Sequence, residues 1–181
     1  MKQHHVFSFL QRMGKSFMLP IAVLPVAGIF LGVGSSLTNE TTIAALHLES
    51  VLGQGTFLYS VLILLKQVGK VLFDNLPLIF AVSIALGMSK RRKEVAALAA
   101  IIAFFVMHAT INTLLCLDGS IVNGVVSNNI LDGSITSVCG MLSLEMGVFG
   151  GIVVGLGVSY LHNHFYQIQL PNVISFYEGE R

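Results

Sequence analysis

The strongest constraint on the fold is an apolar run near the N-terminus. Phe17 to Leu37 (FMLPIAVLPVAGIFLGVGSSL) contains no charged residue. A helix needs roughly 20 mostly apolar residues to cross about 30 Å of bilayer hydrocarbon. A secretory signal peptide has a shorter apolar core with a small-x-small cleavage site close behind it, and this run has neither feature. The sequence therefore predicts a retained transmembrane helix.

Further apolar stretches extend this pattern along the chain. Val95 to Leu117 is uncharged, Leu144 to Leu161 is interrupted only by Glu145, and Leu76 to Met88 is apolar but short. The short stretch crosses a membrane if the preceding turn joins it or if it is one half of a broken helix. The chain is 54% apolar and 10% charged, whereas soluble domains average about 25% charged residues. We expect an all-α, polytopic membrane protein with about four transmembrane helices.

The segment before Pro77 has an amphipathic pattern. From Phe57 to Phe73 and just beyond, polar residues recur at three- and four-residue steps and share one helical face: Lys66, Gln67, Lys70 and Asp74. This pattern predicts an additional amphipathic helix, either at the membrane interface or facing a helix bundle. We expect the breaker Pro77 to separate it from the apolar stretch that follows.

The placement of charge predicts the orientation. Basic residues precede the first span (Lys2, Arg12, Lys15) and follow Met88 (Lys90, Arg91, Arg92, Lys93). The connections 39–56 and 118–143 contain no Lys or Arg but carry several acids. Because Lys and Arg concentrate in cytoplasmic loops, we expect a multi-pass protein with its N-terminus in the cytoplasm. The connection 118–143 is rich in Ser, Asn and Gly and is expected to be an outward-facing loop.

Five polar residues are candidates for a substrate path. Ionisable groups at membrane depth are costly, so they usually line a cavity or pair with one another. Lys70 and Asp74 have the i,i+4 spacing of an ion pair, and Asn75-Leu76-Pro77 resembles the discontinuous helices of transporters. A simple proline kink, with the charges in water at the interface, explains the same residues. The candidates are Ser35, Ser36, Lys70, Asp74 and Asn75.

Two other polar groups have alternative interpretations. Glu145 can be a buried functional acid, but an acid in the first turn of a helix also stabilises that helix, and we favour this second reading. His108 and Asn112 share one helical face, with Thr110 and Thr113 nearby. They are suited either to sugar hydroxyls or to an interhelical hydrogen-bond cluster, and we favour the cluster.

Glycines recur at four-residue steps in two of the predicted spans. Small residues at this spacing let helices approach closely. We expect these glycines to pack helices together, within the chain or across a dimer: Gly28, Gly32, Gly147, Gly151 and Gly155.

Other site types find little support in the sequence. Cys116 and Cys139 do not have the spacing of a metal site, and both fall in the outward region, where a bridge between them stays open. We expect no metal, no cofactor and no catalytic side chains. Ten Lys and Arg against nine Asp and Glu do not indicate a nucleic-acid partner.

Four sequence blocks resemble a known family of membrane permeases. They are GKSFMLPIAVLPVAGIFLGVGSSL, FDNLPLIFAVSIALGMSK, EVAALAAIIAFFVM and the stretch from LEMGVFGG to the C-terminus. In order and spacing they are similar to the N-terminal half of a glucose/maltose-family IIC subunit of the phosphoenolpyruvate-dependent sugar phosphotransferase system. The resemblance runs from about Phe9 to the last residue. At Leu170 to Arg181 it follows the family pattern, with departures at Tyr177 and Glu178.

The resemblance implies that residues 1–181 form the scaffold and dimer-contacting part of a IIC domain in a bacterial inner membrane. The transport half, with the family's sugar-binding histidine and glutamate, and the IIB domain would be absent. The implied partners are a glucose- or maltose-type sugar, IIB and IIA components, a second copy of the chain and the lipid bilayer. Two alternatives are a non-transporting scaffold that modulates a full-length permease, and a small channel or carrier.

Overall fold

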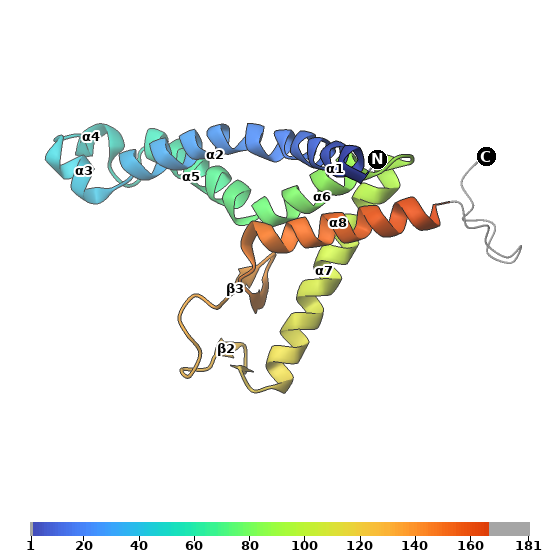
Figure 1. Ribbon diagram of the computed structural model, residues 1–181. Coiled ribbons are helices and arrows are strands. Elements are labelled where there is room, and N and C mark those ends of the chain that lie inside the picture. Colours follow the sequence, from blue (N-terminus) through green and yellow to red (C-terminus); the bar gives the residue numbers. More distant parts are fainter. Residues whose placement is uncertain (1, 167–181) are drawn as a thin grey trace, which may run out of the picture.

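The computed structural model describes residues 2–166 and places most of them in helices (Figure 1). The motif expected at Leu170 to Arg181 lies outside the described residues. The helices are α1 (Lys2–Ser16), α2 (Met18–Leu37), α3 (Glu40–Ala45), α4 (Glu49–Leu52), α5 (Phe57–Asp74), α6 (Leu76–Met88), α7 (Lys93–Leu117) and α8 (Gly147–Phe165). The strands are β1 (Ile121–Val122), β2 (Val125–Val126), β3 (Ile135–Val138) and β4 (Met141–Leu144).

Helices α2 and α5 lie side by side because glycines bring their backbones together. A Cβ added at Gly69 of α5 would lie 2.5 Å from the backbone nitrogen of Leu31 in α2. One turn away, a Cβ at Gly34 of α2 would lie 2.6 Å from the backbone nitrogen of Lys66. Neither site can hold a larger side chain without parting the helices, so the amphipathic α5 is packed against α2 along this contact (Figure 1).

Helix α6 lies at the centre of the packing. Its residues Ala81, Ile84 and Ala85 are fully buried, and it contacts α1, α7 and α8. Phe104 of α7 packs in a cluster with Ala81 and with Val154 of α8. This apolar core holds α6, α7 and α8 together at the point where α7 diverges from the other helices (Figure 1).

Helices α5 and α6 are two parts of one bent unit. They meet at Asn75, where the helix axis bends by 54°. Pro77 occupies the first turn of α6, where its missing N–H costs no intrahelical hydrogen bond. The Asn75 side chain donates from Nδ2 to the carbonyl of Val71 at 2.8 Å. The break therefore comes where the sequence combines a helix-starting proline with an asparagine that binds the end of α5.

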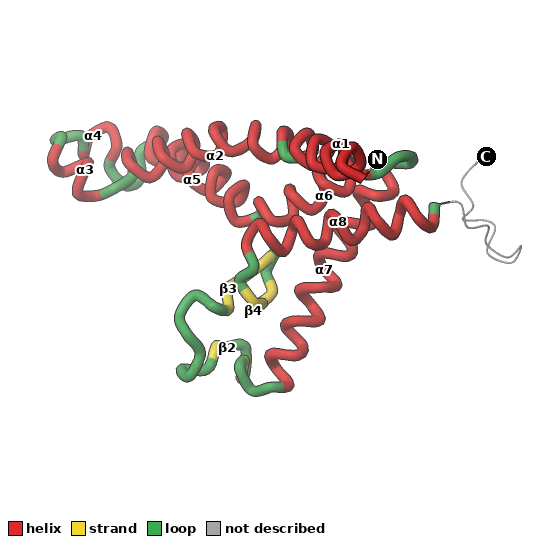
Figure 2. The backbone as a smooth tube through the Cα atoms, viewed as in Figure 1, coloured by secondary structure: helices red, strands yellow, loops and turns green. Residues whose placement is uncertain are grey.

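The expectation of an all-α chain is wrong for the connection between α7 and α8. Two antiparallel hairpins form there, β1 with β2 and β3 with β4 (Figure 2). Each turns at a two-residue segment in which both residues have positive φ, Asn123-Gly124 and Cys139-Gly140. Turns of this kind match the twist of the flanking strands. Asn-Gly between apolar residues is typical of a hairpin turn. The many Ser, Asn and Gly residues of this connection indicated a loop instead.

By length and composition, the described residues offer two or three candidate spans. Among the described residues, Phe7–Leu37 and Lys93–Leu117 are long and apolar enough to cross a membrane, and the bent pair of α5 and α6 makes a third candidate. The first candidate includes much of α1, a helix that the sequence analysis did not predict. Helix α8 is less apolar than these candidates by mean hydropathy, because its last turns carry His162, Asn163 and His164. Four crossings are therefore not confirmed.

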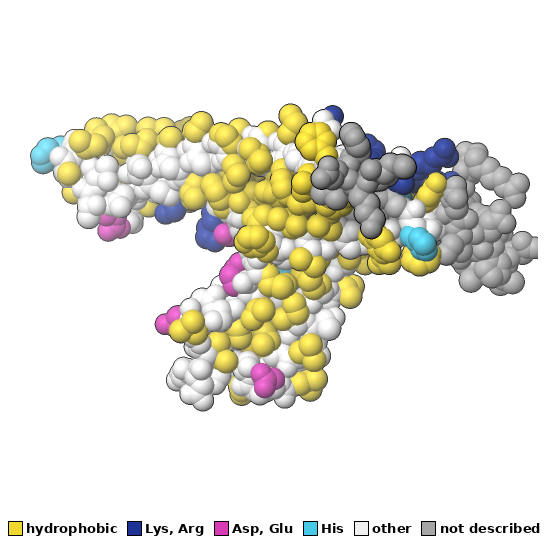
Figure 3. Space-filling view, viewed as in Figure 1, with side chains coloured by type: hydrophobic (Ala, Val, Ile, Leu, Met, Phe, Trp, Pro, Cys, Tyr) yellow, Lys and Arg dark blue, Asp and Glu magenta, His cyan; other side chains and the backbone are white. Residues whose placement is uncertain are grey.

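Basic residues gather where the N-terminal helix meets the connection between α6 and α7 (Figure 3). Ser16 at the end of α1 lies directly against Gly87 of α6. The basic segment that follows Met88 is bound to the end of α8 by Asn163, which accepts from the Lys90 N–H at 2.8 Å and donates to the Met88 carbonyl at 3.0 Å. The two basic segments predicted to share one side of the membrane thus lie at the same end of the molecule.

Candidate functional site

A cavity of about 330 Å³ lies beside the break between α5 and α6. Four helices and one hairpin border it: α5 and α6 at their junction, the middle of α7, the β3–β4 hairpin and the start of α8. Its lining residues are Phe73, Asp74, Leu76, Pro77, His108, Thr136, Ser137, Val138, Glu145, Gly147 and Val148. The cavity is therefore built from segments far apart in the sequence.

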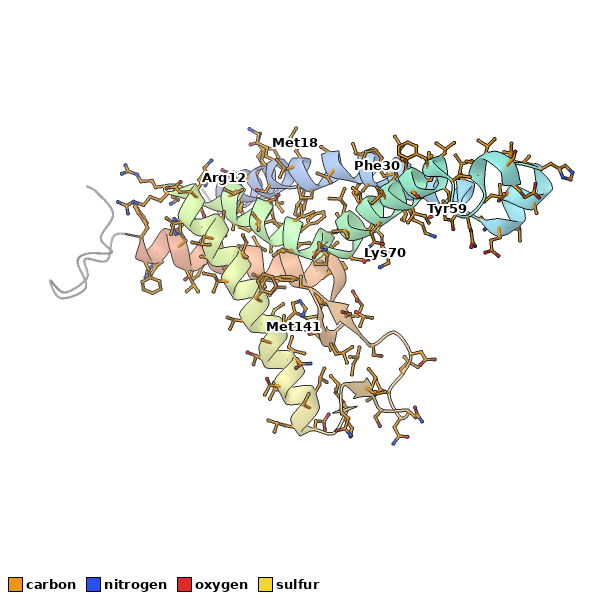
Figure 4. The ribbon with its side chains drawn as sticks, turned by 180° about the vertical axis from the view of Figure 1, so that it is seen from behind. Arg12, Met18, Phe30, Tyr59, Lys70 and Met141 are labelled. Carbon is orange, nitrogen blue, oxygen red and sulfur yellow. The ribbon has the colours of Figure 1, made fainter. Side chains whose placement is uncertain are left out.

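Asp74 lines this cavity from the end of α5, and its side chain is 52% exposed. One carboxylate oxygen, Oδ2, accepts from Lys70 Nζ at 2.5 Å, and no described residue binds Oδ1. Figure 4 shows Lys70 near the end of α5. The next residue, Asn75, accepts through Oδ1 from the thiol of Cys139 at 3.4 Å. The end of α5 is thus joined to the tip of the β3–β4 hairpin.

His108 borders the same cavity from α7 and is only 2% exposed. Its Nδ1 forms a hydrogen bond of 2.7 Å with the hydroxyl of Ser143 in β4. The imidazole also contacts the ring of Phe104, with 4.5 Å between the ring centroids. Within residues 2–166 no group binds Nε2. When the Ser143 hydroxyl donates to Nδ1, the proton of the neutral imidazole is on Nε2, and the ring is a donor.

Glu145 reaches the cavity from the segment between β4 and α8. Its Oε2 accepts from the hydroxyl of Thr136 in β3, and its Oε1 accepts from the backbone N–H of Gly147 at 3.0 Å. The carboxylate therefore caps the N-terminus of α8, where the helix dipole favours negative charge. Glu145 thus lies just before the first turn of α8 and not within that turn, where the sequence predicted it, and its side chain lines the cavity as well.

The cavity can both donate hydrogen bonds to a ligand and accept them from it. Asp74 and Glu145 supply acceptors, Thr136 and Ser137 supply hydroxyls, and His108 supplies a ring nitrogen. Phe73, Leu76 and Pro77 form an apolar wall on one side. In the described part of the chain, no three His, Cys, Asp or Glu side chains are grouped closely enough to hold a metal ion. The arrangement is suited to a polar organic molecule.

Comparison with known proteins identifies the family. Residues 14–181 match the family model described as phosphotransferase system, EIIC. The chain is also 36% identical over 176 residues to the glucose-specific EIICBA component of the phosphotransferase system of Staphylococcus saprophyticus. This chain belongs to the EIIC family. The match covers 97% of the EIIC chain and 24% of that relative, so the chain spans about a quarter of the relative's length. The family predicted from the four sequence blocks is confirmed.

The EIIC chain brings together some of the five predicted path residues. Asp74 lines the cavity, and Lys70 and Asn75 lie next to it. Lys70 binds Asp74, whereas Asn75 binds Cys139. Ser35 and Ser36 lie near the end of α2 and are not among the cavity's lining residues. Thr136 and Ser137 were not predicted as site residues, because the Ser, Asn and Gly of their segment are typical of a loop.

The His108 and Asn112 cluster has a different partner from the one expected. Asn112 donates to the Leu142 carbonyl at 2.6 Å, so both residues bind the hairpin strand β4 and not another helix. Thr110 and Thr113 donate to carbonyls within α7 itself. The cluster therefore fixes the hairpin to α7.

The predicted packing glycines have three kinds of surroundings. A Cβ at Gly155 would lie 2.7 Å from the carbonyl oxygen of Ala81, and one at Gly151 would overlap the carbonyl of Pro77, so both lie where α8 meets α6. Cβ atoms at Gly28 and Gly32 would meet nothing within 4 Å. Gly147 has φ of +50°, and its N–H donates to Glu145.

The two cysteines are both free in the structure. Cys116 is exposed at the end of α7, whereas Cys139 is partly buried at the tip of the β3–β4 hairpin. Burial raises the pKa of the Cys139 thiol, because a thiolate is poorly solvated there. The two thiols therefore differ in exposure, and neither is among the lining residues of the cavity.

Proposed function

We propose that this EIIC chain is the scaffold part of a permease that couples uptake of a glucose- or maltose-type sugar to its phosphorylation. The observation that carries the proposal is the continuous family match from residue 14 to residue 181. The relative's name as a glucose-specific EIICBA component supports a sugar of this class. The match to a permease component also favours transport over the alternatives of a modulator or a small channel.

Helix packing supports a scaffold role. Glycine contacts leave no room between α2 and α5 or between α6 and α8, and interiors packed at this density resist sliding. We propose that this unit stays rigid while a second, sugar-carrying half moves against it. The IIA and IIB components would then deliver the phosphoryl group to sugar held by that other half.

Transport measurements test this proposal. Membrane vesicles would hold the chain alone or together with the downstream half of an EIIC relative, and the general phosphotransferase proteins, IIA and IIB would be supplied. We expect phosphoenolpyruvate-dependent uptake of labelled glucose or maltose, recovered as sugar phosphate, only when both halves are present. Uptake by the chain alone would overturn the scaffold assignment, and no uptake by the two halves together would overturn the transport assignment.

We further propose that the chain forms a homodimer through the face of α2 that carries Gly28 and Gly32. A Cβ added at either glycine would meet no described atom within 4 Å, and exposed hydrophobic side chains such as Ile29 and Val33 lie beside them. Much of the visible surface along α2 is hydrophobic (Figure 3). Small residues that let two backbones approach are a common basis of helix association in membranes.

Thiol cross-linking tests the dimer. In a chain without its two native cysteines, Gly28→Cys should form a covalent dimer on oxidation. Gly157→Cys is the matched control, because Gly157 in α8 also faces open space. Equal cross-linking of the two variants would contradict a specific α2 interface.

A further inference from the structure

We propose that the cavity beside the α5–α6 break is a sugar-binding subsite that takes a single pyranose ring. The identity of the ligand rests on the proposed function, whereas the site itself rests on the geometry of the cavity. The subsite belongs to this half of the EIIC unit and is separate from a site in the downstream half.

The polar atoms of the cavity are arranged for hydroxyl groups. His108 is almost fully buried, is held by Ser143 through Nδ1 and borders the cavity with no described partner for Nε2. At the exposed side, Asp74 has its Oδ1 atom available as an acceptor. A sugar hydroxyl donates and accepts at once, so it can bind an imidazole N–H and a carboxylate together. Ligand sites commonly combine a few such polar groups with apolar walls.

The charges favour a neutral ligand over a metal ion. The carboxylate of Asp74 is paired with the ammonium group of Lys70. The carboxylate of Glu145 accepts from a hydroxyl and from the first N–H of α8, where the helix dipole offsets its charge. Both acids are therefore already compensated, and neither requires a cation. Each still has lone pairs that can accept from a neutral polyol.

The size of the cavity matches one sugar ring. Its volume of about 330 Å³ lies near the lower end of the range of small-molecule pockets, roughly 300–1,000 Å³. Phe73 and Pro77 offer apolar surface to the C–H groups of a pyranose. A disaccharide would have to extend through the exposed side of the cavity, past Asp74.

Cys139 provides a native reporter of this site. Its thiol binds Asn75, and its neighbour Val138 lines the cavity. A ring bound against Val138 and Asp74 would hinder access to the thiol. Neither cysteine is among the lining residues, but Cys139 is next to one of them, whereas Cys116 is exposed at the far end of α7. The Cys116→Ser chain therefore reports on the site, and the Cys139→Ser chain is its matched control.

The test is the rate of alkylation by N-ethylmaleimide in the reconstituted full chain. With glucose or maltose at rising concentration, we expect saturable slowing at Cys139, at least about threefold, and no change at Cys116. Glycerol at equal concentration should have no effect. Asp74→Asn and Glu145→Gln, each made in the Cys116→Ser chain, should shift half-protection to about tenfold higher sugar. Circular dichroism would verify that both variants are folded.

The outcomes separate this inference from the proposed function. Unchanged alkylation at every sugar concentration would overturn the subsite, even if the two-half permease transports sugar. Protection that survives unaltered in both carboxylate variants would also overturn it, because the sugar would then bind elsewhere. Protection that is weakened by the variants, together with a failure of the two halves to transport sugar when combined, would keep the subsite and remove the permease assignment.

Discussion

Asp74 and Glu145 hold equivalent positions on either side of one cavity, each two residues before the first residue of a helix, α6 at Leu76 and α8 at Gly147. The two helices pack against each other through Gly151 and Gly155. Their N-termini therefore lie at the same cavity, and a carboxylate accompanies each. The cavity follows from this close packing, since the two helices bring together the end of α5 and the segment before α8.

The cap of α8 predicts different effects for two substitutions of Glu145. Glu145→Ala removes the acceptors for Thr136 and for the Gly147 N–H, so we expect a loss of about 1–2 kcal/mol of stability. Glu145→Gln keeps an acceptor oxygen and should lose less than half of that. Thermal unfolding in detergent, followed by circular dichroism, measures both. Equal losses would show that the negative charge matters more than the hydrogen bonds.

The buried pair of His108 and Ser143 predicts a stability cost. Ser143→Ala leaves Nδ1 of His108 without its partner, and an unsatisfied buried polar group costs about 1–3 kcal/mol. Ser137→Ala is the matched control, because Ser137 is exposed on the preceding strand of the same hairpin. We expect the control to stay within about 0.5 kcal/mol of the parent protein. Similar unfolding temperatures for the two variants would contradict the importance of this hydrogen bond.

The contact between α6 and α8 predicts that a single methyl group is harmful at one glycine and harmless at another. Gly155→Ala places a Cβ against the Ala81 carbonyl, and such overpacking costs about 1–3 kcal/mol. Gly157→Ala meets open space on the same helix, so its better helix propensity should stabilise the protein by roughly 0.5–1 kcal/mol. The difference in unfolding temperature between the two variants is the measurement. A stable Gly155→Ala variant would mean that the helices separate readily.

The contact of Asn163 with the basic connection predicts a change in proteolysis. Asn163→Ala removes the partners of the Lys90 N–H and the Met88 carbonyl, so we expect at least a several-fold increase in the rate of trypsin cleavage after residues 90–93. Asn129→Ala, in the exposed segment before β3, is the control.

The same assay tests the proposed orientation. Cleavage of the basic connection should occur in inside-out vesicles and not in right-side-out vesicles. Cleavage from the outside would reverse the orientation that the basic residues predict.

The burial of Cys139 predicts a pH dependence of its alkylation. Because its pKa is raised above the ordinary 9.0, the reactive thiolate forms only at higher pH. In the Cys116→Ser chain, the rate of alkylation should therefore keep rising as the pH passes through 9.0. A denatured sample should level off at lower pH. A plateau below 9.0 in the folded protein would contradict the burial of this thiol.

The sequence predicted the helices better than it predicted the site. The uncharged runs gave α2 and α7 to within two residues at either end, because a hydrocarbon environment requires a long apolar helix. The Lys70 and Asp74 pair and the break at Asn75 were also predicted, since i,i+4 spacing and Pro77 act locally. The hairpin β3–β4 was missed, although it supplies Thr136, Ser137 and Val138. Its position depends on Asn112 and His108 in a distant helix, and no local pattern encodes such contacts.

The β3–β4 hairpin is fixed to α7 by two hydrogen bonds, from Asn112 to the Leu142 carbonyl and between His108 and Ser143. The preceding connection, from Gly119 to Ser134, makes few such contacts with the helices. Chain length should therefore vary unevenly among relatives. Inserted or deleted residues should accumulate ahead of Ile135, whereas the stretch from Ile135 to Gly147 should keep its length, since one added residue would reverse which strand side chains face α7.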